Sequence, residues 1–161
     1  MLYHTKLKNN NIHHDETTLV FIYGSLKKGF CNHHMMKKAK YKCKAKTRKR
    51  YGMFQEKNAN YPYLIKQSNS CYHHIIGEVY EVETSTTLKQ LDIFEDAPEY
   101  YQREIIEIET ASGSIQKAQV YFMKEYTIPS EQTPLREWKE DDNYHLKQFE
   151  SYYSKATATA R

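Results

Sequence analysis

The chain has 161 residues, of which 39% are hydrophobic and 27% charged, a composition typical of one globular domain. Its net charge of +4 is too small to indicate a nucleic-acid partner, and no apolar stretch is long enough to cross a membrane. Three cysteines without a CxxC spacing favour a reduced, cytoplasmic setting. Tyrosine is unusually frequent, with 15 residues, and suits a pocket with polar groups on its walls.

A polar stretch comes first, and residues 1–17 predict a flexible arm without the apolar core of a secretory signal. Residues 19–23 form a short apolar run that is typical of a buried strand, and this run ends in a tight turn at Gly24-Ser25. Such a turn presents several backbone N–H groups at one point. It therefore suits an anion or a developing oxyanion.

Residues 27–38 predict a short helix, and residues 39–54 predict a long strand. Basic residues alternate with less polar ones in this strand, which indicates one solvated face. A phosphate backbone could bind that face, but the aromatic side chains do not interleave with the charges, so a solvated face is favoured. The expected outer residues are Lys40, Lys42, Lys44, Lys46 and Arg48, and the expected inner ones are Tyr41, Cys43, Ala45 and Thr47.

The second half of the chain predicts further short strands and one clear helix. Within the strand at 75–83, Gly77 indicates a bulge or a close approach. The helix covers residues 84–96, where Thr87 and Gln90 fit a capping box. Many short strands with few helices indicate an α+β chain whose antiparallel or mixed sheet can close into a barrel. The other predicted elements are strands at 63–65, 105–110 and 116–124, the last two as a hairpin, some helix within 131–153, and a disordered end at 154–161.

The helix at 84–96 carries the main candidate for chemistry. On a helical wheel, Glu95 falls between Leu88 and Leu91 on the apolar face. Burial raises the pKa of a carboxyl group toward neutrality, as a general base at neutral pH requires. Two interpretations stay open here. Glu95 is either an acid–base group or one member of a buried ion pair with Arg103 or a lysine.

Three other chemistries fit the residues less well. Adjacent residues of a strand point to opposite faces, so neighbouring histidines cannot easily share a metal ion, and no metal site is predicted. Cys31 has no base beside it in the sequence, so we expect an incidental thiol. Ser25 lacks a nucleophile elbow, so we expect it to act as a backbone donor or to hydrogen-bond substrate. The histidine pairs are His13-His14, His33-His34 and His73-His74.

Several short motifs follow one another in a fixed order. They are Tyr23-Gly24-Ser25-Leu26, Lys27-Lys28-Gly29, Asn32-His33, Tyr61-Pro62, Gly77-Glu78-Val79-Tyr80, Leu91-Asp92-Ile93-Phe94-Glu95 and Tyr100-Tyr101-Gln102-Arg103. In this order, over about residues 18–125, they resemble the γ-glutamylcyclotransferase-like family, also called AIG2-like or BtrG-like. The Lys-Gly…Asn-His and Tyr-Gln-Arg parts look most like its γ-glutamylamine cyclotransferase branch.

This resemblance implies a small mixed β-barrel flanked by helices over residues 18–147, followed by a tail at 148–161. It implies that an amine is released from a γ-glutamyl amide while the substrate's own α-amine closes 5-oxoproline, without a metal, a cofactor or a covalent nucleophile. The acid–base role falls on Glu95. The implied substrate-binding residues are Tyr23, Gly24, Ser25, Leu26, Tyr101 and Tyr121.

The alternative is a non-catalytic protein of the same fold that binds a small γ-glutamyl-like or acidic ligand. Glu95 on an apolar helix face favours the enzyme, whereas the basic strand and the polar arm would suit an interaction protein. The expected partner is a small γ-glutamyl substrate, with no nucleic acid and no membrane. The expected assembly is a monomer or a weak homodimer.

Overall fold

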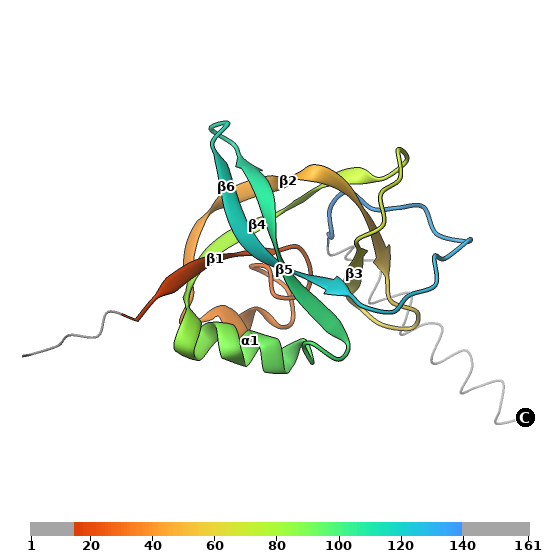
Figure 1. Ribbon diagram of the computed structural model, residues 1–161. Coiled ribbons are helices and arrows are strands. Elements are labelled where there is room, and N and C mark those ends of the chain that lie inside the picture. Colours follow the sequence, from red (N-terminus) through yellow and green to blue (C-terminus); the bar gives the residue numbers. More distant parts are fainter. Residues whose placement is uncertain (1–14, 140–161) are drawn as a thin grey trace, which may run out of the picture.

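Five strands close into a small mixed barrel in this computed structural model, which describes residues 15–139 (Figure 1). Hydrogen-bonded neighbours follow the order β2-β4-β1-β6-β5, and a further pairing of β2 with β5 closes the ring. Strands β1 and β6 run parallel, while the other pairs are antiparallel, so the predicted mixed barrel is confirmed. The strands are β1 (Thr17–Ile22), β2 (Lys40–Gln55), β4 (His73–Glu83), β5 (Tyr101–Thr110) and β6 (Ile115–Met123), and β3 (Pro62–Ile65) pairs with the end of β2.

Strand β1 lies inside the sheet, between β4 and β6. Its last three side chains are buried on both faces, which explains why the sequence there is a continuous apolar run and does not alternate. Val20 and Ile22 belong to one core cluster, whereas Phe21 belongs to the other, and each is at most 3% exposed. The predicted strand at 19–23 is therefore confirmed as interior, although it begins two residues earlier.

The solvated face of β2 is also confirmed, because its lysines are exposed while Ala45 and Thr47 are buried. Tyr41 was expected to point inward, and this prediction is wrong: the side chain is 51% exposed. A register shift between Tyr41 and Cys43 breaks the alternation at this point, as a β-bulge does. The Tyr41 ring instead packs edge-on against Tyr80.

The predicted helix at 84–96 forms in two parts: a π-helical turn at Thr84–Leu88 and then α1 (Lys89–Phe94), with Glu95 as the C-cap. The predicted capping box is wrong, because the wide first turn begins earlier in the chain, with Glu83 as its N-cap. No side chain caps it, and the Thr86 hydroxyl donates to the Glu83 carboxylate at 2.9 Å. In Figure 1, α1 lies against one side of the barrel, beside the segment that follows β1.

That segment contains a 3-10 turn at His33–Met36 and not the helix predicted over 27–38. Gly29 has a φ of 91°, in the left-handed region, which a continuous right-handed helix cannot include. Successive reverse turns therefore replace the helix. One of them is closed by the bond from the Lys27 N–H to the Gly24 carbonyl at 3.0 Å.

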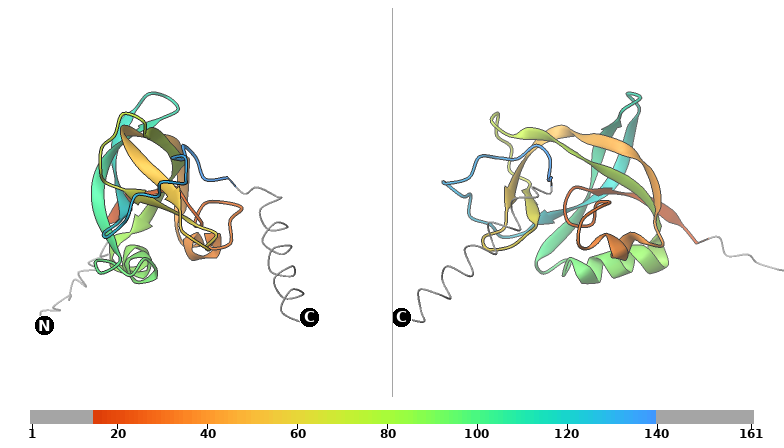
Figure 2. Two further views of the ribbon diagram at one scale, coloured as in Figure 1. Left: turned by 90° about the vertical axis from the view of Figure 1, so that its right-hand side faces the viewer. Right: turned by 180° about the vertical axis from the view of Figure 1, so that it is seen from behind.

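Residues 124–139 cover one end of the barrel without forming a strand of it (Figure 2). The Leu135 N–H donates to the Met53 carbonyl, and the Ile76 N–H donates to the Arg136 carbonyl. Residues 131–139 contain no helix. The rest of the helix expected within 131–153, the arm over 1–14 and the tail over 148–161 lie outside the described residues. Within residues 15–139, no helix is long and apolar enough to span a bilayer.

Candidate active site

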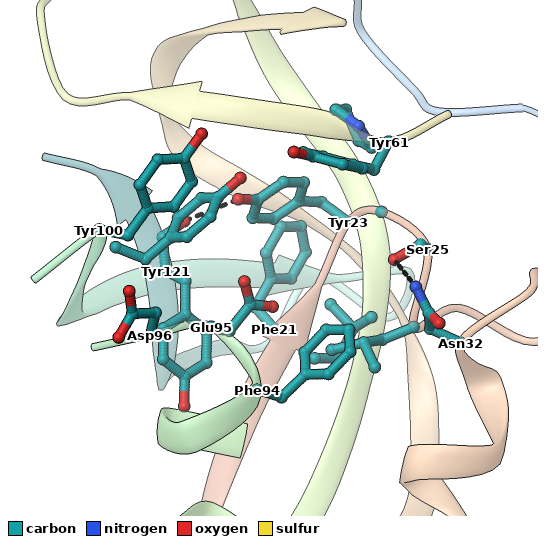
Figure 3. Close-up of a pocket in the computed structure, with 15 residues that line it drawn as sticks. Phe21, Tyr23, Ser25, Asn32, Tyr61, Phe94, Glu95, Asp96, Tyr100 and Tyr121 are labelled. Carbon is teal, nitrogen blue, oxygen red and sulfur yellow. Dashed lines mark hydrogen bonds between the residues drawn. The ribbon is translucent and has the colours of Figure 1, made fainter. Parts of the chain in front are cut away.

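A pocket of about 300 Å³ forms where the end of β1 meets the end of α1 (Figure 3). Two segments about 70 positions apart in the sequence build it: the turn after β1 and the C-terminal end of the helix. All seven predicted site residues line this pocket, although their roles remain predictions. They are Tyr23, Gly24, Ser25, Leu26, Glu95, Tyr101 and Tyr121.

Gly24 lies close to the side chain of Pro62, which leaves little room for a larger residue at the turn. A Cβ atom at this position would lie 3.0 Å from the ring of Pro62, which is tighter than ordinary van der Waals contact. The N–H groups of the next two residues, Ser25 and Leu26, donate to no backbone acceptor within residues 15–139. The turn can therefore offer hydrogen-bond donors to a ligand.

The side chains around the turn add one more donor. Asn32 Nδ2 donates to Ser25 Oγ at 3.0 Å, and this bond leaves the Ser25 hydroxyl proton available to a ligand. His33 Nδ1 lies 2.9 Å from the Leu26 carbonyl and holds the following loop close to the turn. Figure 3 shows Ser25 and Asn32 together at one side of the pocket. This side suits a carboxylate or an oxyanion.

Glu95 lies on the helix side of the pocket without a charged partner. Its partly buried carboxylate makes no hydrogen bond or ion pair with the part of the chain that the structure describes, and Figure 3 shows it among aromatic rings. Burial raises the pKa of Glu95 from its ordinary 4.5 to about 7. The alternative pairing with Arg103 is not formed, because Arg103 binds Asp92 through two hydrogen bonds of 2.7 and 3.1 Å.

Three buried tyrosines complete the inner wall. Burial, and then the negative charge of Glu95, raise the pKa of Tyr23. The pKa values of Tyr101 and Tyr121 are also raised, mainly by burial. These hydroxyls therefore stay protonated at neutral pH and can hydrogen-bond a ligand without acting as bases. The Tyr23 hydroxyl donates to the Tyr121 carbonyl at 2.8 Å, so toward a ligand it offers an acceptor.

Sequence reasoning missed other residues of the wall. Asn32, Tyr61 and Phe94 stood in the motif set without a role, and Phe94 is 40% exposed at the pocket. Tyr100 also stood in the motif set without a role, and Asp96 lies at the end of the predicted helix, where no pattern marked it. Five of the 15 tyrosines line the pocket, so the unusual tyrosine content was a general pointer to it.

The remaining sequence candidates lie away from the pocket. No group of three or more His, Cys, Asp or Glu side chains that could hold a metal ion occurs within residues 15–139. Cys31 is exposed and does not line the pocket. The His13-His14 pair lies outside the described residues.

The sequence and the fold are similar to those of known proteins. A profile of the family described as "Gamma-glutamyl cyclotransferase, AIG2-like" matches residues 20–146. The chain is 42% identical over 107 residues to a Methanocaldococcus jannaschii protein named "Putative gamma-glutamylcyclotransferase MJ1514", covering 66% of this chain and 84% of that one. It is 37% identical over 112 residues to "Gamma-glutamylaminecyclotransferase C" of Danio rerio, covering 63% and 72%. The crystal structure of an AIG2-like protein from Mus musculus superposes with a TM-score of 0.70 and 26% identity, covering 81% of this chain and 92% of that one.

Proposed function

Because this chain belongs to the gamma-glutamyl cyclotransferase, AIG2-like family, we propose that it releases 5-oxoproline and an amine from a γ-glutamyl amide, with Glu95 as general acid and base. One observation carries the assignment of Glu95. Its carboxylate is partly buried and unpaired within the described residues, and its pKa of about 7 suits proton transfer at neutral pH. The name of the Danio rerio relative, a gamma-glutamylaminecyclotransferase, favours a γ-glutamylamine as the substrate.

The first step is removal of a proton from the substrate's α-ammonium by Glu95. The freed amine then attacks the γ-carbonyl carbon of the same molecule, and a five-membered ring forms. Because nucleophile and carbonyl belong to one molecule, the pocket has only to hold them in the reactive conformation. Its volume of about 300 Å³ suits a small ligand.

The second step is collapse of the tetrahedral intermediate. The carbonyl oxygen carries negative charge at this stage, and the N–H groups of Ser25 and Leu26, which have no backbone acceptor among the described residues, can stabilise it. The bond between the γ-carbonyl carbon and the leaving nitrogen breaks, and Glu95 returns its proton to that nitrogen. The ring nitrogen still carries a second proton, which Glu95 then accepts and releases to solvent. The products are 5-oxoproline and the free amine, and the carboxylate of Glu95 is regenerated.

The distribution of donors and acceptors gives the substrate one orientation. Donors gather at the turn, where Ser25 retains its hydroxyl proton, so the α-carboxylate and the carbonyl oxygen belong on this side. Acceptors gather at Glu95 and at Tyr23, whose proton is already donated to a carbonyl, so the α-amine belongs there. This arrangement places the proton to be removed next to the group that removes it.

The test is incubation of the purified protein with a panel of γ-glutamyl amides, including γ-glutamyl-ε-lysine and γ-glutamyl-alanine, with 5-oxoproline as the measured product. Each amide is paired with its N-acetyl derivative, which has no free α-amine. We expect 5-oxoproline from at least one free amide and none from its acetylated partner. Binding of the amides without any 5-oxoproline would instead indicate the non-catalytic alternative.

A further inference from the structure

We propose that Asp92 is a positioning residue for this reaction: it locks the end of α1 against the barrel and keeps Arg103 away from Glu95. Asp92 lies three residues before Glu95, about one helical turn away. The proposal rests on the proposed function in one respect, because it takes Glu95 as the acid–base group.

The contacts of Asp92 join three elements at one carboxylate. Its Oδ1 accepts a hydrogen bond from Arg103 Nε at 2.7 Å and another from the Tyr121 hydroxyl at 2.7 Å, and its Oδ2 accepts from Arg103 Nη2 at 3.1 Å. Arg103 also donates from Nη1 to Gln119 Oε1 at 3.0 Å. The helix is thus tied to β5 through Arg103 and to β6 through Tyr121.

The network reaches the pocket wall through Tyr121. Arg103 and Tyr121 are direct cross-strand partners, so both groups that bind Asp92 come from one rigid pair of strands. The Tyr121 ring lines the pocket, and its carbonyl accepts the hydroxyl proton of Tyr23 on the opposite side. A displacement of Asp92 would therefore move Glu95 and also disturb the wall that it faces.

The helix needs this support because few apolar contacts hold it. Helix α1 has six residues and one fully buried side chain, Leu91, while Leu88 in the preceding turn adds a second apolar contact. Ile93, on the outer side, is 79% exposed. Glu95 is the C-cap, so its carboxylate follows any tilt of this short helix. A displacement of about 1 Å can cost on the order of a hundredfold in rate.

Asp92 has a second consequence, which is electrostatic. The tyrosines that interact with Glu95 are Tyr23 from the end of β1, Tyr101 from β5 and Tyr121 from β6, all neutral at neutral pH. Asp96 is the other carboxylate that lines the pocket, and Arg103 is the cation beside Tyr121. While Asp92 holds the guanidinium by two bonds, the charge of Arg103 is compensated. Without Asp92, this cation would stabilise the Glu95 carboxylate and lower its pKa, which would make Glu95 a weaker base.

The first test is Asp92→Asn, which keeps the size of the side chain and removes its charge. We expect kcat to fall by roughly ten- to a hundredfold while KM changes by less than about threefold, because the residue does not touch substrate. The rising limb of the rate against pH should move from about 7 to lower pH, on the order of one pH unit. Glu107→Gln, at an exposed position of β5, is the matched control and should behave as the wild type.

A double variant separates the two roles. In Asp92→Asn/Arg103→Met neither charge is present, so the pKa of Glu95 should return to about 7. Its kcat should stay low, because the helix is still not anchored to the barrel. Arg103→Lys keeps the positive charge but cannot make the bidentate contact with Asp92. It should therefore recover part of the kcat that Arg103→Met loses.

A readout that needs no turnover keeps this proposal distinct from the proposed function. The Glu95 carboxyl is titrated by NMR in protein with ¹³C-labelled glutamate, and its signal is assigned with Glu95→Gln. Absence of 5-oxoproline from the wild type would contradict the proposed function only, while a lower titration midpoint in Asp92→Asn would still support the electrostatic role. Unchanged kcat and an unchanged midpoint in a folded Asp92→Asn protein would overturn the proposal. A loss of kcat that merely follows a loss of folded protein in thermal melts, with no change of midpoint, would overturn it too.

Discussion

The pocket and the outer face of β2 differ in whether their charged side chains lie opposite a side chain of the other sign. On β2, the register places the exposed Lys40 opposite Glu81, Lys44 opposite Glu78 and Lys46 opposite Glu109, and the three glutamates are half-buried. In the pocket, Glu95 is partly buried and has no opposite charge across from it among residues 15–139. The surface strand sets lysines opposite glutamates, whereas the carboxylate of Glu95 in the pocket has no cation opposite it among the described residues.

This difference separates a structural use of charge from a functional one. Opposite charges across a solvated sheet contribute only about 0.2–1 kcal/mol per pair, and they lower the potential that a polyanion would meet. An unpaired carboxylate in a buried place reduces stability, so its presence in a pocket is a sign of chemistry. The basic run of the sequence is therefore the weaker functional candidate, although it is the more conspicuous one.

The largest effect should come from Glu95→Gln, which keeps size and hydrogen bonding but cannot accept a proton. Acid–base roles contribute roughly a hundred- to ten-thousandfold in rate, so 5-oxoproline formation should fall by at least about a hundredfold. Binding of 5-oxoproline, measured by calorimetry, should change far less because the donors of the turn remain. If Glu95→Gln kept wild-type turnover, the unpaired carboxylate of the pocket would be no more functional than the charges of the surface strand.

A smaller effect concerns stability. The pKa of Glu95 is about 7 in the folded protein and 4.5 as its ordinary value, so the folded state loses stability as pH rises through this window. This shift in pKa lowers the free energy of unfolding by on the order of 3 kcal/mol at the upper end of this pH range. Glu95→Gln should therefore melt at a higher temperature than the wild type at pH ~8, and the two should converge by pH ~4. The ion-pair interpretation predicts the opposite, a Gln variant that is less stable near neutral pH.

The smallest effect should come from the surface strand. Replacing Lys40, Lys42, Lys44, Lys46 and Arg48 together by Gln should leave 5-oxoproline formation within about twofold of the wild type, because these side chains point into solvent and away from the pocket. Melting temperature should fall slightly, and less so in high salt, since only weak surface pairs are lost. A collapse of turnover in a protein that remains folded would assign this face a part in catalysis.

Several features of the fold could be predicted because their cause lies within a few residues. The alternation of β2, the continuous apolar run of β1 and the hairpin of β5 and β6 each follow from a local pattern of burial. Predictions failed where a neighbour in space changed the local preference. Tyr41 turned outward at a bulge, and the helix began in a π-turn ahead of its expected cap at Thr87.

The sequence by itself determined which residues are the candidates for the chemistry: the period of the helix puts Glu95 on its apolar face, and the apolar run before Gly24 ends in a turn. It left open whether Arg103 pairs with Glu95, because both carboxylates of the helix lie within reach of a long side chain. Only the tertiary structure decided this. The register of β5 and β6 sets Arg103 beside Tyr121, and both bind Asp92. The partner of a charge depends on which strands the barrel brings together, and no local pattern contains that information.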